Sequence, residues 1–364
     1  MQSDDKRAAF AEKMTGILNG GALNLALGIG YRSGLLDAMD GLDGPCTAEQ
    51  IAAAANLDLR YVTEWLGVMA CGGIVEVHKA PSDAEDERFR LPQEHGDLLC
   101  RRAGENNLGV YTQEIPLLTD LVLDRVIDGF SSGRGIAYRH YPAFQQFMGE
   151  LADAKHDSVL VQRFLPSVDG GMLVADLDEG IDVCDLGCGS GKAVLLMAAA
   201  FPRSRFTGID LDEDAVAGAA GIASDLGLDN AGFRRLDAAA IETDPGMEDR
   251  FDYITAFDAI HDQTRPLAAL RGARHMLRPG GRFSMIDIAA ESGIAENREH
   301  PMGAFLYTVS LMHCMPVGLA DNGRGLGMMW GRKKAVELLE QAGFTDVSVE
   351  AIPDDTFNDH YLCR

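Results

Sequence analysis

The chain has 364 residues, of which 46% are hydrophobic and 24% charged, a balance that is typical of folded proteins and excludes a disordered, collagen-like or coiled-coil chain. The length favours two domains. With 32 Lys and Arg against 56 Asp and Glu, the formal net charge is −24, and such a field repels nucleic acid and anionic membranes. We therefore expect a small-molecule partner, and neither a nucleic acid nor a membrane.

The seven cysteines are widely scattered, and no two of them form a Cys-x-x-Cys pair. This spacing indicates neither a disulfide framework nor a zinc knuckle. The chain begins Met1-Gln2-Ser3-Asp4-Asp5, which lacks the basic and apolar regions of a secretory signal, and no apolar run reaches the length of a bilayer span. We expect a cytoplasmic protein.

The first hundred residues combine a glycine-rich helical segment with the pattern of a winged helix. Apolar residues at helical spacing over 8–39 are interrupted by six glycines, which favours two or three closely packed helices. Thr47 and Gln50 then have the spacing of a capping box. Helices are expected at 51–55 and 60–71, and strands at 74–77 and 88–91 on either side of a polar wing tip at 82–87. Residues 1–104 are therefore predicted to form a winged-helix domain.

Charge argues against DNA binding by this domain. Residues 1–100 contain 8 Lys and Arg against 16 Asp and Glu, and the helix that would enter the groove offers only Arg60 as a cation. A surface that follows phosphates needs the opposite sign. We expect a packing or dimerisation module, with a DNA-binding regulator as the alternative.

The remainder of the chain has the pattern of an α/β protein. Residues 105–178 alternate helical patterns with polar breaks and are predicted to form a helical connector. Short apolar runs then alternate with helical ones, which indicates a Rossmann-like parallel sheet over 179–364. The seven expected strands cover 181–186, 205–211, 232–236, 251–257, 282–288, 346–351 and 358–363.

The sharpest motif follows the first of these strands, in the sequence Val183-Cys184-Asp185-Leu186-Gly187-Cys188-Gly189-Ser190-Gly191. Glycines at every second position let a ligand approach the backbone, and the next helix points its N-terminus at that ligand. A dinucleotide fingerprint would need glycine at Lys192, and a Walker loop would need glycine at Leu186. The remaining pattern predicts ligand contacts from Asp185, Gly187, Gly189 and Gly191.

Two further carboxylates follow the next two strands. Asp210 lies 19 residues after Gly191, at a position where a carboxylate can accept both hydroxyls of a ribose. Asp237 ends the third strand, where it can accept from an adenine amino group while the neighbouring backbone meets the ring. Together these positions predict a nucleoside site.

In this order and spacing, the three motifs resemble the class I S-adenosylmethionine-dependent methyltransferases over about residues 180–290. The winged helix, together with 111–116, 257–263 and 310–315, resembles the mycobacterial two-domain winged-helix subgroup. The resemblance implies S-adenosylmethionine as cofactor, S-adenosylhomocysteine as product, and a homodimer. It also adds Leu211, Ala238 and Phe257 to the expected cofactor contacts.

The methyl acceptor is expected at the carboxyl ends of the strands. His261 follows the fourth strand, and an imidazole can remove a proton from a hydroxyl or thiol near neutral pH. Asp262 or Asp258 is expected to orient the ring, and Asp262 also to contact the substrate. The alternative is that His261 is a histidine with only a structural role. Many class I enzymes have His-His a little beyond this strand, where this chain has His261-Asp262, so a role carried over from the resemblance does not extend to position 262.

An insertion of about forty residues, 289–331, lies between the fifth strand and the next helix, a length that is typical of a lid. His313 is the substitute base, reached by lid closure. Tyr307 and Trp330 of the insertion, and Gln113 and Tyr138 of the connector, are the expected substrate contacts. No metal is predicted, because His300, His313 and Cys314 lack the tight histidine spacing of a zinc site.

These observations predict an enzyme that moves the methyl group of S-adenosylmethionine to a small molecule by direct displacement. The acceptor atom is left open among oxygen, nitrogen, sulfur and carbon. One rival is the regulator named above, in which the Rossmann-like domain only senses the cofactor. The other is an enzyme that uses the bound cofactor without transferring its methyl group.

Overall fold

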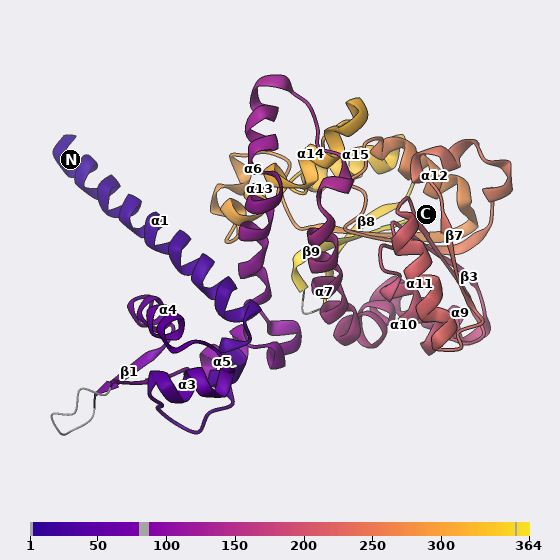
Figure 1. Cartoon of the computed structure of the whole chain (residues 1–364). Coiled ribbons are helices and arrows are strands. Elements are labelled where there is room, and N and C mark those ends of the chain that lie inside the picture. Colours follow the sequence, from indigo (N-terminus) through magenta and orange to yellow (C-terminus); the bar gives the residue numbers. More distant parts are fainter. Residues whose placement is uncertain (1–2, 80–86, 354) are drawn as a thin grey trace. The chain divides into compact units, whose positions relative to one another are not determined.

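A computed structural model describes residues 3–79, 87–353 and 355–364, and its chain divides into two compact units, Met1–Leu117 and Leu118–Arg364 (Figure 1). This division rests on contacts between residues. The domain bounds that were inferred from the sequence stay a prediction. Each unit is described by itself.

The first unit has the element order of a winged helix. Its capping box forms as expected, because Thr47 Oγ1 accepts from Gln50 N while Gln50 Oε1 accepts from Thr47 N. The strands pair antiparallel, and the predicted wing tip falls largely on residues 80–86, outside the described residues. The elements are α1 (Ser3–Arg32), α2 (Leu35–Asp40), α3 (Ala48–Ala55), α4 (Leu59–Cys71), β1 (Glu76–Lys79), β2 (Glu87–Arg90) and α5 (Gln93–Leu99).

Helix α1 runs unbroken for 30 residues through most of the glycines that were expected to interrupt it. Close packing explains only some of these glycines. A Cβ on Gly30 would lie 2.5 Å from the ring of Trp65, whose Nε1 donates to Ala26 O at 2.8 Å. A Cβ on Gly16 would meet no described atom within 4 Å. The N-terminal half of α1 is therefore a single exposed rod.

The second unit contains a seven-stranded sheet in the order β5-β4-β3-β6-β7-β9-β8. All neighbours pair in parallel except at β9, which runs antiparallel to both β7 and β8. The fold class predicted from the sequence is thereby confirmed. The strands are β3 (Asp182–Leu186), β4 (Arg205–Asp210), β5 (Ala231–Arg235), β6 (Phe251–Phe257), β7 (Leu277–Ile288), β8 (Val347–Ile352) and β9 (Asp355–Cys363).

Helices cover both faces of this sheet. Helices α12 (Pro266–Met276) and α15 (Gly331–Gln341) contribute side chains to one apolar cluster. Helices α9 (Met172–Glu179) and α10 (Lys192–Ala200) contribute to the cluster on the other face. The sheet is buried on both sides, as parallel sheets usually are.

The connector and the insertion are also helical. The connector contains α6 (Glu114–Ser132), which begins in the first unit, and α7 (Pro142–Val159), and the insertion contains α13 (Gly303–Met312) and α14 (Cys314–Leu319). Helix α11 (Glu213–Asp225) connects β4 to β5. The segment Gly303–Asn322 is long and apolar enough to cross a membrane by composition, and 56% of it is buried inside the protein, as the core helices of other proteins often are.

Candidate functional site

The strand order reverses direction between β3 and β6, and the candidate site lies at this point of the sheet. Chain connections leave β3 toward β4 on one side, while β6 leads to β7 on the other. In open α/β sheets a crevice forms at the carboxyl ends of the strands where the order reverses. The glycine loop follows β3, and the segment of His261 follows β6.

Three glycines of the loop after β3 have positive φ angles, but for different reasons. A Cβ on Gly187 would lie 2.6 Å from Ala259 Cβ, and one on Gly191 would lie 2.5 Å from the ring of Phe233. Gly189, with φ +50°, faces open space among the described residues. The outer glycines are therefore needed for packing within the protein, whereas Gly189 leaves its backbone open to a ligand.

Asp210 at the end of β4 holds this loop in place. Its Oδ2 accepts from Gly189 N at 2.8 Å, and its Oδ1 accepts from Asp212 N at 2.9 Å. Each carboxylate oxygen has a second lone pair. The side chain is half-buried, so both oxygens can accept further hydrogen bonds from ribose hydroxyls.

Asp185 at the end of β3 is buried beneath the loop. It is 3% exposed, and Thr255 on the adjacent strand β6 donates its hydroxyl to Asp185 Oδ1 at 2.7 Å. Burial raises the pKa of Asp185 to about 7, the Thr255 hydrogen bond lowers it, and the charge of Asp210 raises it. A cation bound in the crevice would favour the ionised form of this carboxyl group.

The other expected cofactor contacts lie around the same edge of the sheet. Asp237 accepts from Ala239 N at 2.9 Å through Oδ1, and its Oδ2 forms an ion pair with Arg265 at 2.7 Å. One oxygen of the expected adenine contact is therefore already paired with a cation. Leu211 is exposed, Ala238 is buried, and the ring of Phe257 lies edge-on to Phe164 with centroids 5.8 Å apart.

His261 is paired with a buried carboxylate on the neighbouring strand β7. Its Nδ1 lies 2.7 Å from Asp287 Oδ1, and the two side chains are 4% and 0% exposed. Burial alone would lower the pKa of His261, but Asp287, Asp262 and Cys314 together raise it well above its usual 6.5. Asp287 thus fixes the tautomer of the neutral ring, in which Nε2 carries the lone pair, and the raised pKa means that this neutral form is populated at higher pH than for a free imidazole.

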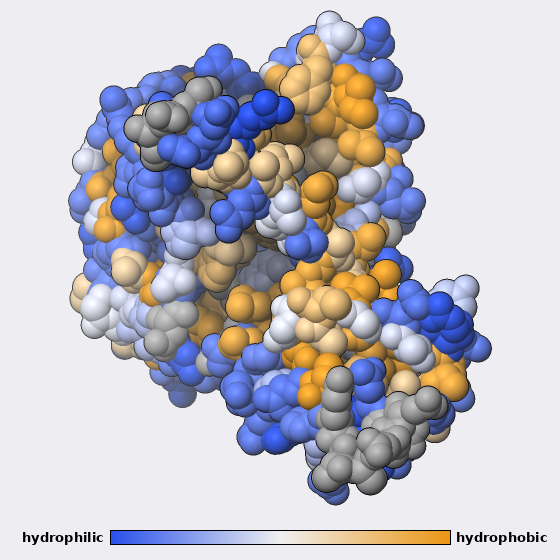
Figure 2. Space-filling view, turned by 90° about the vertical axis from the view of Figure 1, so that its left-hand side faces the viewer, coloured by the Kyte–Doolittle hydropathy of each residue, from blue (hydrophilic) through white to orange (hydrophobic). Residues whose placement is uncertain are grey.

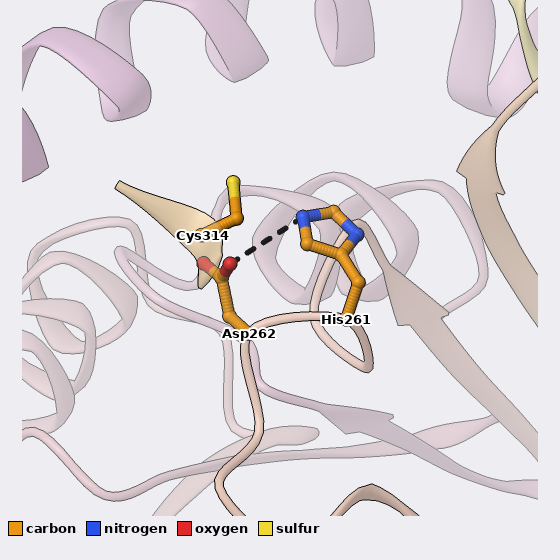
Figure 3. A group of neighbouring side chains, drawn as sticks. All are labelled: His261, Asp262 and Cys314. Carbon is orange, nitrogen blue, oxygen red and sulfur yellow. Dashed lines mark ion pairs between the residues drawn. The ribbon is translucent and has the colours of Figure 1, made fainter. Parts of the chain in front are cut away.

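The Nε2 side of His261 faces Asp262 and Cys314, as Figure 3 shows. The Nε2 atom lies 3.5 Å from Asp262 Oδ1, and the Cys314 thiol is 3% exposed beside them. Burial and Asp262 raise the pKa of this thiol to about 12, so it stays protonated at neutral pH. The cluster therefore presents one imidazole and one carboxylate that can exchange a proton with a ligand.

His313, the substitute base, has different surroundings. Its ring is packed among Phe144, Tyr141 and Tyr138, at centroid distances of 4.5, 4.8 and 5.9 Å. Burial lowers its pKa, Asp262 opposes this effect, and His261 adds to it. His313 is therefore a neutral ring in an aromatic wall.

Tyr138 lies beside the histidines, with its ring centroid 5.9 Å from that of His313. Burial raises the pKa of its hydroxyl, and the charges of Asp262 and Asp210 act in the same direction. The structure thus brings Tyr138, His261, Asp262 and His313 together.

Two groups of potential metal donors overlap in this cluster. Donor atoms of His261, Asp262 and Cys314 lie within 4.8 Å of one another, as do those of Asp258, His261 and Asp287. In the second group the imidazole and Asp287 already satisfy each other by a hydrogen bond. The prediction that the protein needs no metal stays a prediction.

Two expected substrate residues of the second unit have other surroundings than the histidine cluster. The Tyr307 hydroxyl accepts from Asn297 Nδ2 within the insertion. Trp330 is 6% exposed and packs in the apolar cluster that also contains side chains of α12 and α15. Gln113 belongs to the first unit, where its side chain donates to Val110 O.

Sequence reasoning missed Asp287 and Thr255. Both lie inside strands that were recognised only by their apolar residues. Asp287 stands between Ile286 and Ile288, and an acidic residue in such a run is unusual unless it is paired. That anomaly was the available signal.

Comparison with known proteins supports two domains. Residues 177–348 match the family described as "Methyltransferase domain", and residues 21–101 match the "Rv2258c-like winged HTH domain". The chain is 35% identical over 134 residues to Nocamycin O-methyltransferase of Saccharothrix syringae, a match that covers 36% of this chain and 46% of that protein. The chain thus spans about half the length of the curated relative.

Solved structures are similar over nearly the whole chain. Human N-acetylserotonin methyltransferase in complex with SAM has a TM-score of 0.65 at 18% identity, with 100% of this chain and 99% of that chain covered. Mitomycin 7-O-methyltransferase MmcR has a TM-score of 0.66 at 18% identity, with 100% of both chains covered. The structure titled "PigF with SAH" has 0.64 at 18%, covering 100% and 99%. At these identities the similarity confirms the fold.

Proposed function

We propose that the chain is an S-adenosylmethionine-dependent methyltransferase with an Rv2258c-like winged-helix domain, and that it methylates a hydroxyl oxygen of a small molecule. The observation that carries the choice of oxygen is the buried His261–Asp287 pair. A hydroxyl must lose its proton during methylation, and this pair can receive it. A neutral amine has a free lone pair and needs no such base.

The loop after β3 suits the cofactor. Bound S-adenosylmethionine supplies a methyl group on a positively charged sulfur, which is activated for direct displacement. Gly189 leaves the space that a bound nucleoside needs, and Asp210 offers free lone pairs beside it. Asp185 lies at the same strand edge and can become a counter-charge for a cation.

The acceptor is proposed to lie against Tyr138 and the aromatic wall around His313. His261 Nε2 takes the hydroxyl proton as the oxygen forms its bond to the methyl carbon and the carbon–sulfur bond breaks. Asp287 stabilises the imidazolium that results. The products are a methyl ether and S-adenosylhomocysteine.

The test is to incubate the protein and S-adenosylmethionine with a panel of small hydroxyl, thiol and amine compounds. We expect S-adenosylhomocysteine together with an acceptor that is one CH₂ group heavier, for hydroxyl compounds. His261→Ala should lower kcat by roughly 10²–10⁴ with cofactor affinity nearly unchanged. Undiminished kcat in this variant, or methylation confined to amines, would contradict the proposal.

We also infer a homodimer that buries the exposed apolar face of α1. Space-filling shows hydrophobic side chains gathered in patches on one face of the molecule (Figure 2). On α1, six large apolar residues are between 38% and 69% exposed, and they recur at helical spacing: Phe10, Met14, Ile17, Leu18, Leu25 and Ile29. Such a stripe is typical of a subunit interface.

Light scattering should therefore give about twice the chain mass of 39.2 kDa. Leu18→Ser should shift the mass toward that of a monomer. Leu226→Ser, on a residue that is 63% exposed in the second unit, is the matched control and should leave the mass unchanged. A wild-type protein that stays at the mass of one chain at micromolar concentration would refute the dimer.

A further inference from the structure

A second cavity lies on the connector side of the second unit. It has a volume of about 490 Å³, within the range of small-molecule pockets. One wall is formed by the end of α6 and the segment that follows it, residues 131–140. The other wall is formed by Ala320 and Asp321 of the insertion.

This cavity is rich in cations, although the chain as a whole has a net charge of −24. Arg125, Arg134 and Arg139 line it, against the two carboxylates Asp128 and Asp321. Among the residues that the structure describes, no ion pair joins any of these three guanidinium groups to a carboxylate. Elsewhere in the unit, arginines such as Arg278 and Arg332 are paired with aspartates.

Neutral polar groups complete the lining. The hydroxyls of Ser131 and Ser132 and the imidazole of His140 border the cavity; Ser131 Oγ donates to Asp128 O, and Ser132 Oγ accepts from Arg134 N. Burial, Arg125 and Arg139 lower the pKa of His140, so its ring is neutral at pH 7 and adds a hydrogen-bond donor without a charge. Guanidinium and hydroxyl groups together match the oxygens of carboxylates and phosphates.

The cavity lies at the junction of two segments that also form the wall of the reaction centre. Ile136 N donates to Pro316 O at 2.8 Å, and a Cβ on Gly135 would lie 2.2 Å from Ala320 N. Tyr138, two residues after Ile136, lies against the ring of His313. A ligand bound to Arg139 therefore lies next to the segment that carries Tyr138.

We propose that this cavity binds a small organic anion of the carboxylate or phosphate class, apart from the cofactor crevice. The anion is held by Arg125 and Arg139, with Arg134 and the two serines at the rim. Binding braces the connector against the insertion.

The experiment uses calorimetry with the full chain and two probes, pyrophosphate and citrate, at low ionic strength and with S-adenosylhomocysteine present at saturation. We expect one site per chain whose affinity falls with added salt. The double change Arg125→Gln and Arg139→Gln should weaken binding at least about tenfold. The control combines Arg298→Gln with Lys333→Gln, two exposed cations outside the cavity, so that it removes the same two charges, and it should alter affinity less than about twofold.

A measurement on the unmodified chain guards against misfolding of the variant. An arginine-specific dicarbonyl reagent, read by mass spectrometry, should modify Arg125 and Arg139 more slowly when pyrophosphate is present, and Arg298 at an unchanged rate. The proposal is overturned if neither probe binds, if S-adenosylhomocysteine abolishes binding, or if the double variant and the control bind equally. Because these readouts do not involve methyl transfer, they are independent of the proposed function.

Discussion

Replacing Asp287 with asparagine tests the assignment of His261 as the base. The substitution keeps the size of the side chain and removes its charge 2.7 Å from His261 Nδ1. Both groups are buried, and breaking a buried charge pair typically costs about 3–5 kcal/mol. A loss of roughly 10²–10⁴ in kcat corresponds to about 3–5 kcal/mol of activation free energy. Asp287→Asn should therefore remove most of the rate enhancement that a general base provides.

The pH dependence of activity shows whether Asp287 raises the pKa of His261. Asp287, Asp262 and Cys314 raise the pKa of His261, so activity should increase with pH through a value above 6.5. Asp287→Asn removes the largest of these charges, and the rising limb of kcat/KM should move to lower pH while its plateau falls. Because a raised pKa in the folded state stabilises fully below 6.5, the variant should also lose unfolding free energy most at acid pH.

The assay is methyl transfer to an acceptor found in the panel, measured between pH 5.5 and 9.5, with cofactor affinity followed by calorimetry. Asp359→Asn is the matched control, since Asp359 pairs with Asp287 in register across β7 and β9 but bonds to Arg332. Asp359→Asn should lower the free energy of unfolding and leave the rising limb of kcat/KM at the wild-type pH. An Asp287→Asn enzyme with the wild-type limb and plateau would refute the reasoning.

Three further predictions concern the cofactor crevice. Asp210→Asn should weaken S-adenosylmethionine binding by about 1–3 kcal/mol in calorimetry, because a charged acceptor is lost, whereas the exposed Asp225→Asn should change nothing. Gly189→Val should abolish binding while the protein stays folded by circular dichroism, since its Cβ projects into open space at φ +50°; normal binding would remove this loop from the site. Asp185→Asn should stabilise the empty protein above pH 7 in urea unfolding. Burial raises the pKa of Asp185 from 3.8 to about 7, so the contribution of this group to the free energy of unfolding is fully present below pH 3.8 and falls by about 1.4 kcal/mol per pH unit up to pH 7. A variant that shows the same fall would contradict this assignment.

The sequence was sufficient for the sheet and for the cofactor loop because both depend on local patterns. The run Phe251–Phe257 was expected as a strand and is β6 with those bounds. Glycine spacing singled out Gly187, Gly189 and Gly191 as expected ligand contacts, and all three have positive φ in the structure. Such signals need no knowledge of tertiary contacts.

The cluster around His261 depends on contacts that no local sequence pattern contains. His261 was singled out by its place after β6, but its partner was sought in Asp258 or Asp262 nearby in sequence. The carboxylate at 2.7 Å is Asp287, 26 residues away on the adjacent strand. Trp330 was expected to contact the substrate from the insertion, whereas the structure places its side chain in the main apolar cluster.

The α1 helix shows where propensity misleads. Its glycines suggested breaks, yet the chain continues through them as one helix of 30 residues. Each glycine weakens a helix by only about 1 kcal/mol, and the surrounding alanines and leucines are strong helix formers. A partner surface for the exposed stripe would add the stabilisation that an isolated helix lacks.

The two hydrogen bonds that Asp210 accepts from Gly189 N and Asp212 N have a consequence for the speed and thermodynamics of cofactor capture. They fix the loop in its open form before any ligand arrives, so its conformational entropy is lost during folding and not during binding. Such preorganisation lowers the entropic cost of binding a ligand at this loop, and it removes the need for the loop to rearrange during association.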